Sequence, residues 1–295
     1  MKKLIIAFSI LLFFASCEKD ITFNTENVEP KLVVDAQIET NQPPIVVLTK
    51  SVNYFSSINS SILNTLFIHN AKVILTNGSK THQLKEYSIV QNGVTLYFYS
   101  NDISSPTTSF VGENGKDYNL SIETDGKTYT TSTTIPVLAK KMDSAWWKPA
   151  PALVDTNFAT VMVKVTDPLG LGNYIRVFVQ QGTKNQFLPT QNSAFDDQVI
   201  DGKTYQLPLS PGVDRNAKPK GGDTASYFFK GDTVTLKLCN ITKPTYDFWS
   251  TWEFAYSAIG NPFSSPNKVL GNISGGALGA FSGYATQFKT VIIPK

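Results

Sequence analysis

The sequence is poor in the side chains that catalysis, metal binding and cross-linking use most. It has two cysteines, two histidines and three methionines in 295 residues. Such small numbers exclude a dense metal centre and a framework of disulfides. Arginine is equally scarce, with Arg176 and Arg215 alone, and the 26 basic side chains nearly balance the 23 acidic ones. The chain therefore lacks the composition of a nucleic-acid binder.

Apolar residues, by contrast, are plentiful. They make up 41% of the chain and charged residues 17%, which is enough to bury a substantial core. This excludes a wholly disordered or collagen-like protein. At this length the chain can form one large domain or two ordinary ones.

The N-terminus, residues 1–16, predicts a lipoprotein signal peptide. Two lysines precede a mostly apolar run, residues 4–16, that is too short to span a membrane as a helix. The run ends in Phe14-Ala15-Ser16-Cys17, which is typical of a bacterial lipobox. We therefore expect cleavage before Cys17 and membrane attachment through acyl chains on that cysteine. Residues 17–30 would then include a short tether; a plain secreted protein is the alternative.

Residues 31–137 predict an antiparallel β-sandwich. Short alternating or β-branched runs dominate this region. Three dipeptides, Asn77-Gly78, Asn92-Gly93 and Asp125-Gly126, join consecutive runs, and such pairs tolerate the positive φ of a hairpin turn. Regular strands and turns at this spacing are typical of a sandwich.

Residues 138–295 predict a second β-rich domain that carries one helix. Prolines interrupt the pattern over 136–157, where we place the domain boundary, and residues 183–224 are expected to be irregular. An amphipathic helix is expected over 244–259, with one apolar stripe that packs on the second sheet: Trp249, Trp252, Tyr256 and Ile259. Strands are expected on either side, the last at 288–293. The predicted fold class is all-β, with two antiparallel sandwiches.

Candidate catalytic groups are few and scattered. Cys239 ends a predicted strand and is interpreted as a buried or inert thiol, and His69 and His82 as solvated side chains. Asp196, Asp197 and Asp201 could supply the paired carboxylates of a hydrolase. The same aspartates could hold Ca²⁺, but residues 196–202 fit no calcium-loop pattern. A solvated turn is the preferred interpretation of this run. The prediction is a protein without enzymatic activity, metal or cofactor.

Two segments are candidate recognition surfaces. Trp146 and Trp147, at the predicted domain boundary, have the flat faces that bind sugars and peptides, although such residues also pack one domain on another. The irregular stretch 183–224, which includes Asp196 and Asp197, is the second candidate, because long loops in compact domains are often functional. The glycine-rich run 271–279 lacks the lysine of a phosphate loop and instead suits close backbone approach over a sheet.

Several motifs together resemble a known family. They are the lipobox, Asn70-Ala71-Lys72-Val73, Met142-Asp143-Ser144 and the run Asn272-Ile273-Ser274-Gly275-Gly276-Ala277-Leu278-Gly279. The chain resembles, over essentially its whole mature length, the Bacteroidota lipoproteins grouped as domain of unknown function 4249. The resemblance implies an outer-membrane setting, often beside TonB-dependent transporters, and a first domain similar to the regulatory sandwich of carboxypeptidases. The family has no established activity, so it supplies no site residues.

Two smaller motifs are similar to other Bacteroidota signals. Glu18 and Asp20 resemble a surface-export signal, so we expect display on the cell surface, with the periplasmic leaflet as the alternative. Ser144 and Thr224, in predicted loops, match a short O-glycosylation pattern.

Together these features predict a lipid-anchored, non-enzymatic accessory protein of the outer membrane that contacts a TonB-dependent transporter or its cargo. A stand-alone surface binder of glycans or peptides is the main alternative. A carboxylate-dependent hydrolase is a remote one.

Overall fold

A computed structural model describes residues 29–52, 60–91, 93–151, 154–183, 186–217, 222, 224–261, 263–265 and 267–295. The predicted signal peptide, the lipidation candidate Cys17, most of the predicted tether and Asn92 lie outside the described residues. Lys31–Ser51 and Ser57–Lys295 cluster into one compact unit that contains every helix and strand named below.

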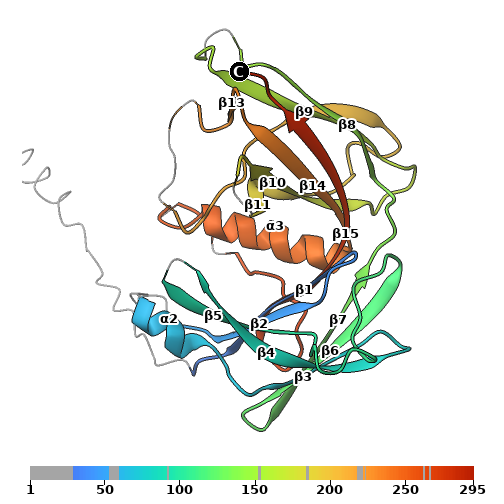
Figure 1. Cartoon of the computed structure of the whole chain (residues 1–295), viewed down its shortest axis with the longest axis vertical. Helices are drawn as coiled ribbons and strands as arrows, with labels where there is room; N and C mark the ends of the chain where they lie inside the picture. Colours follow the sequence, from blue (N-terminus) through green and yellow to red (C-terminus); the bar gives the residue numbers. More distant parts are fainter. Residues whose placement is uncertain are drawn as a thin grey trace, which may run out of the picture. The chain divides into compact units, whose positions relative to one another are not determined.

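The described chain is all-β, as the sequence predicts (Figure 1). Two helices, α2 (Ser60–Leu66) and α3 (Lys243–Ser257), interrupt the strands. The strands of the N-terminal half are β1 (Leu32–Glu39), β2 (Ile45–Lys50), β3 (Lys72–Thr76), β4 (Thr81–Gln91), β5 (Val94–Ser100), β6 (Lys116–Thr124) and β7 (Lys127–Ile135). Those of the C-terminal half are β8 (Lys141–Pro149), β9 (Phe158–Thr166), β10 (Tyr174–Gln181), β11 (Leu188–Phe195), β12 (Thr204–Leu209), β13 (Phe228–Phe229), β14 (Thr233–Ile241) and β15 (Leu278–Ile292).

Eleven strands follow one another in a continuous hydrogen-bonded order, β11-β10-β14-β15-β1-β2-β5-β4-β3-β6-β7. A second sheet holds β12, β9 and β13, and β8 pairs with β9. The pairings are antiparallel apart from that of β1 with β15, which is parallel. Because β15 pairs with β14 as well as with β1, the last strand joins the first strand to the C-terminal sheet.

The turn predictions hold where they can be followed. Thr124 pairs with Lys127 across Asp125 and Gly126, both with positive φ, and Gln91 pairs with Val94 across the turn that holds Gly93. The glycine-rich run also makes the predicted close approaches. A Cβ at Gly279 would lie 1.9 Å from the carbonyl oxygen of Val34, so that a side chain there would break the pairing of β15 with β1.

Four secondary-structure predictions are wrong. The proline-interrupted stretch 136–157 contains β8, and the supposedly irregular stretch 183–224 contains β11 and β12. The final strand begins ten residues early, at Leu278, since glycine and alanine lower β propensity without preventing pairing. The short helix α2 was not predicted at all.

Buried side chains form three hydrophobic clusters, of which the two larger ones are called the first and the second core. The first gathers residues of β1–β7 with Phe281 and Ala285 of β15, and the second gathers residues of β8–β10, β12–β14 and the chain's end. Alternation along each strand explains both cores, because every second side chain points inward. The second core positions the site described next.

Candidate functional site

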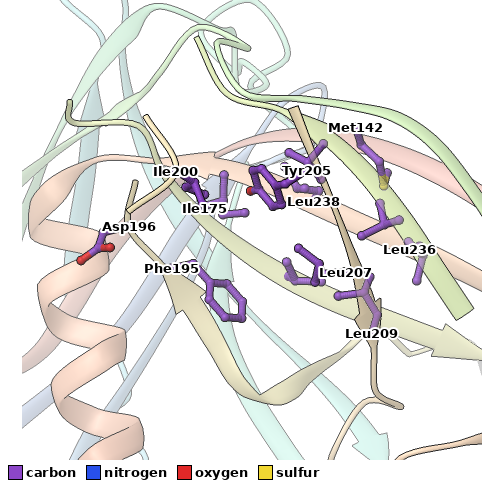
Figure 2. A pocket seen from close by; sticks show the side chains of 13 residues that line it. Met142, Ile175, Phe195, Asp196, Ile200, Tyr205, Leu207, Leu209, Leu236 and Leu238 are labelled. Carbon is purple, nitrogen blue, oxygen red and sulfur yellow. The ribbon is translucent and has the colours of Figure 1, made fainter. Parts of the chain in front are cut away.

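A cavity of about 240 Å³ lies inside the second core (Figure 2). Its walls come from β8, β9 and β12 on one side and from β10, β11 and β14 on the other. The lining side chains are almost all aliphatic or aromatic: Met142, Val163, Val165, Ile175, Val177, Phe195, Asp196, Ile200, Tyr205, Leu207, Leu209, Leu236 and Leu238. Six of the thirteen come from the stretch 183–224 that the sequence singles out as a recognition surface.

The size of the cavity is unusual for a packing defect. An engineered core cavity of about 150 Å³ already binds benzene, and this space of about 240 Å³ is larger. An apolar cavity of this kind is the usual form of a small-molecule site.

The cavity opens beside residues 195–207. Phe195 is 37% exposed, and Ile200, Tyr205 and Leu207 are half-buried. The apolar side chains of the opposite walls, such as Val163 and Leu236, are buried. Partial exposure of inward-facing side chains on one segment marks that segment as the mouth.

Two polar side chains stand at this mouth. The carboxylate of Asp196 turns away from the apolar lining (Figure 2). It accepts a hydrogen bond of 3.2 Å from the hydroxyl of Tyr246 in α3. Burial, followed by the charge of Asp196, raises the pKa of Tyr246. Burial, with the charge of Asp167, raises the pKa of Tyr205 to about 12. Both tyrosines are therefore neutral hydroxyl groups at physiological pH.

An acidic cluster braces the segment behind the mouth. Asp167, Asp197 and Asp201 each place a carboxylate oxygen within 4.8 Å of the others. Backbone N–H groups of Gly172 and Asn173 each donate to Asp197 at 2.8 Å. Burial alone would raise the pKa of Asp197, but these hydrogen bonds outweigh burial and lower it. Asp197 is thus an ionised anchor between two loops.

A lysine supplies the positive charge that this cluster needs. The Nζ atom of Lys140 lies 2.8 Å from Oδ1 of Asp167, and both side chains are completely buried. Oxygen ligands in this number could hold a hard cation, but the ammonium already neutralises one of the three carboxylates. The cluster is a structural ion pair joined to loop anchors, and we assign it no metal.

The aspartates singled out by the sequence therefore separate into two roles. Asp197 and Asp201 join Asp167, and the backbone N–H of Gly170 donates to Asp201 at 2.7 Å. Asp196 instead bonds Tyr246 at the mouth. The interpretation of the run as a solvated turn fails for Asp197, which is buried because its carboxylate satisfies two loop N–H groups.

The two adjacent tryptophans point to opposite faces of β8. Trp147 packs against the second core together with Ala145, while Trp146 alternates to the outer face. They do not form one flat surface. Of the two candidate glycosylation residues, Thr224 lies exposed in a turn, whereas Ser144 lies exposed on a strand and not in the predicted loop, since β8 runs through it.

The thiol and histidine predictions have mixed outcomes. Cys239 is completely buried, which confirms the predicted buried thiol, and burial raises its pKa to about 12. His69 is exposed, as predicted. His82 is buried, contrary to the prediction, because its ring fills a polar niche: Nε2 accepts from the N–H of Asp102 at 2.8 Å and Nδ1 lies 2.8 Å from the hydroxyl of Thr108.

The helix shows a feature that the sequence did not reveal. The Cζ atom of buried Arg176 lies 3.4 Å from the ring centroid of Trp249, and that of Arg215 lies 5.2 Å from the ring of Trp252. The predicted apolar stripe therefore stacks on guanidinium groups. Ile259, its last member, lies beyond the end of α3 and is exposed. Both arginines of the sequence thus contact aromatic rings of this one helix.

Comparison with known proteins places the chain in a family. A search of curated proteins found no match. Within the described residues, neither helix has the length and apolar character needed to cross a membrane. A family model described as a domain of unknown function (DUF4249) matches residues 18–290 of the 295 in the chain. The chain therefore belongs to the DUF4249 family.

Proposed function

We propose that this protein is a lipid-anchored, non-enzymatic binding protein of the outer membrane that serves a TonB-dependent transporter as an accessory subunit. The observation that carries the proposal is the apolar cavity in the C-terminal half, because preformed apolar cavities typically hold small molecules. The lipobox supports the location, since acyl chains on Cys17 would keep the cavity at the membrane surface.

The test is co-purification from the native membrane. A tagged, full-length chain is extracted in mild detergent, and its partners are identified by mass spectrometry. A transporter recovered in stoichiometric amount is the expected result. Recovery of the lipoprotein alone would contradict the accessory role. A Cys17→Ala variant is the control, and it should lose both the membrane and the partner.

The stretch 183–224 cannot be deleted as a test of partner contact. It contains β11 and β12, and Leu209 of β12 is part of the second core, so deletion would unfold the site itself. Substitutions at exposed positions such as Gln198 and Val199 are the appropriate probes. Loss of the transporter from a folded Val199→Asp variant would place the contact at the mouth.

A polar hollow favours the second candidate, a stand-alone glycan binder. A space of about 590 Å³ lies between β3, β6 and β7 and the segment 272–274. Its lining is rich in hydroxyl and amide groups: Thr76, Asn119, Ser121, Thr130, Ser132, Asn272 and Ser274. An Asn119→Ala, Ser132→Ala double variant should weaken binding of oligosaccharides measured by calorimetry. Unchanged binding would remove this hollow from consideration.

A further inference from the structure

We propose that the cavity of the second core takes one apolar molecule of about ten carbon atoms that ends in a neutral or positively charged group. A medium-chain alcohol or amine fits this description, and a carboxylate of the same length does not. The inference rests on the proposed binding function and names its ligand class.

The volume sets the length of the ligand. An apolar cavity of about 150 Å³ accepts benzene, which has six carbon atoms. On the same scale, a cavity of about 240 Å³ accommodates about ten carbon atoms. A much longer chain would have to leave part of its length in water.

The lining sets the apolar character. Aliphatic side chains from five strands surround the space, among them Val163, Val177 and Leu236. The polar members of the lining, Asp196 and Tyr205, both lie on the segment 195–207 that forms the mouth. A bound molecule would therefore place its chain inside and its polar end at this segment.

The charges near the mouth select the polar end. Asp196 stands at the rim, and the cluster of Asp167, Asp197 and Asp201 lies behind it. Lys140 is completely buried and paired with Asp167, and Lys203 is exposed, where solvent screens its charge. A carboxylate at the mouth would face an excess of negative charge, whereas an amine would be attracted by that charge and a hydroxyl would not be repelled by it.

The mouth is held in place before any ligand arrives. Asp197 fixes the loop of Gly172 and Asn173, and Asp201 fixes Gly170. The connection between β11 and β12 is thereby tied to the connection between β9 and β10. Preorganisation of this kind reduces the entropy that a ligand must overcome.

The experiment uses the mature chain from residue 17 with Cys17→Ser, purified without detergent so that neither acyl chains nor surfactant compete. Calorimetric titrations at pH 7 compare 1-decanol, decylamine and decanoate. We expect the alcohol and the amine to bind at one site, with decanoate at least tenfold weaker. Hexadecylamine should bind more weakly than decylamine. An Asp196→Asn variant should reduce the difference in affinity between decanoate and decylamine.

Two filled variants and a matched control locate the binding. Leu207→Trp fills the cavity from β12, and Val163→Phe fills it from β9. Gln206→Trp places the same bulk one residue away, on the exposed face of β12. Decylamine should fail to bind both filled variants and should bind the Gln206→Trp variant as it binds the unfilled chain. Thermal unfolding verifies that each variant is folded.

Each result has one meaning. Absence of binding to the unfilled chain, or equal binding to folded filled variants, would overturn the assignment of the cavity. Decanoate binding as tightly as decylamine would overturn the charge selection. The proposed accessory role fails separately, because it depends on recovery of a transporter from the membrane. If decylamine binds but no transporter is recovered, the ligand assignment stands and the accessory role is contradicted.

Discussion

The N-terminal and C-terminal cores differ in the side chains that fill them. Four aromatic residues, Tyr99, Phe110, Tyr118 and Phe281, stand among the buried residues of the first core. In the second core Phe228 is the one aromatic residue of the buried set, and seven of its fifteen members are valines. Both cores follow the same alternation of inward side chains. The second core holds the cavity of about 240 Å³, whereas the first is built of bulkier aromatic side chains; we call the two halves hollow and filled in this sense.

The two halves also differ in how far their ion pairs are buried. In the N-terminal half Lys72 and Glu123 pair on adjacent strands, with each side chain about half exposed. In the C-terminal half Lys140 and Asp167 pair with no exposure at all. Exposed pairs contribute little to stability, but removal of one partner from a buried pair leaves an uncompensated charge. Loss of one partner should therefore cost more stability for the Lys140 to Asp167 pair than for the Lys72 to Glu123 pair.

The largest expected effect is that of Lys140→Met. The change leaves the buried carboxyl group of Asp167 without its ammonium partner, at an expected cost of about 3–5 kcal/mol in the free energy of unfolding. Urea denaturation measures it. The matched control is Lys72→Met, which should cost less than about 1 kcal/mol. If both variants lose the same free energy of unfolding, the buried pair contributes no more to stability than the exposed one.

The same substitution, valine to phenylalanine, should have opposite effects on the free energy of unfolding in the two cores. Val73→Phe adds bulk to the filled core and should destabilise the protein by about 1–3 kcal/mol. Val163→Phe adds the same bulk beside the cavity and should raise the free energy of unfolding by about 0.5–2 kcal/mol. Denaturation in the absence of ligand measures both. A destabilised Val163→Phe variant would show that the cavity cannot accept a ring.

The filled half was also the more predictable one. Its structure can be predicted from short stretches of sequence, such as the hairpin turn Asp125-Gly126 and the alternating run 32–38. A two-residue turn and a period of two can be recognised without knowing which distant residues they contact. In the C-terminal half β11 contains Pro189 and Asn192 and is held by non-local pairing with β10, including a register shift. Local propensity is overridden there by tertiary contacts.

The candidate site was only partly predictable for a related reason. The sequence selected the stretch 183–224 and Asp196, which do line the cavity. A cavity, however, is defined by which strands face one another and by the volume that their side chains leave empty. Neither can be predicted from local sequence patterns. The Lys140 to Asp167 pair joins residues 27 positions apart, so it was equally invisible.

A smaller effect should distinguish the adjacent tryptophans. Trp147→Ala removes a half-buried ring from the second core and should lower the free energy of unfolding by about 2 kcal/mol, roughly half the cost of a fully buried ring. Trp146→Ala, on the outer face of β8, should cost less. Thermal unfolding of both variants measures the difference. A more costly Trp146→Ala would reverse the assignment of faces.

The smallest expected effect is a pH dependence from the N-terminal half. Burial, opposed by the charge of Asp102, lowers the pKa of His82 below its ordinary value of 6.5. Between that lowered pKa and 6.5 the unfolded chain binds more protons than the folded chain, so stability should fall as the pH drops below about 6.5. The lowered pKa of Asp197 acts only below about 3.8, outside this range. Melting temperatures between pH 8 and pH 5 should therefore decline for the native chain and remain flatter for His82→Gln, whose amide can still donate and accept. An equally steep decline in the variant would assign the pH dependence to another group.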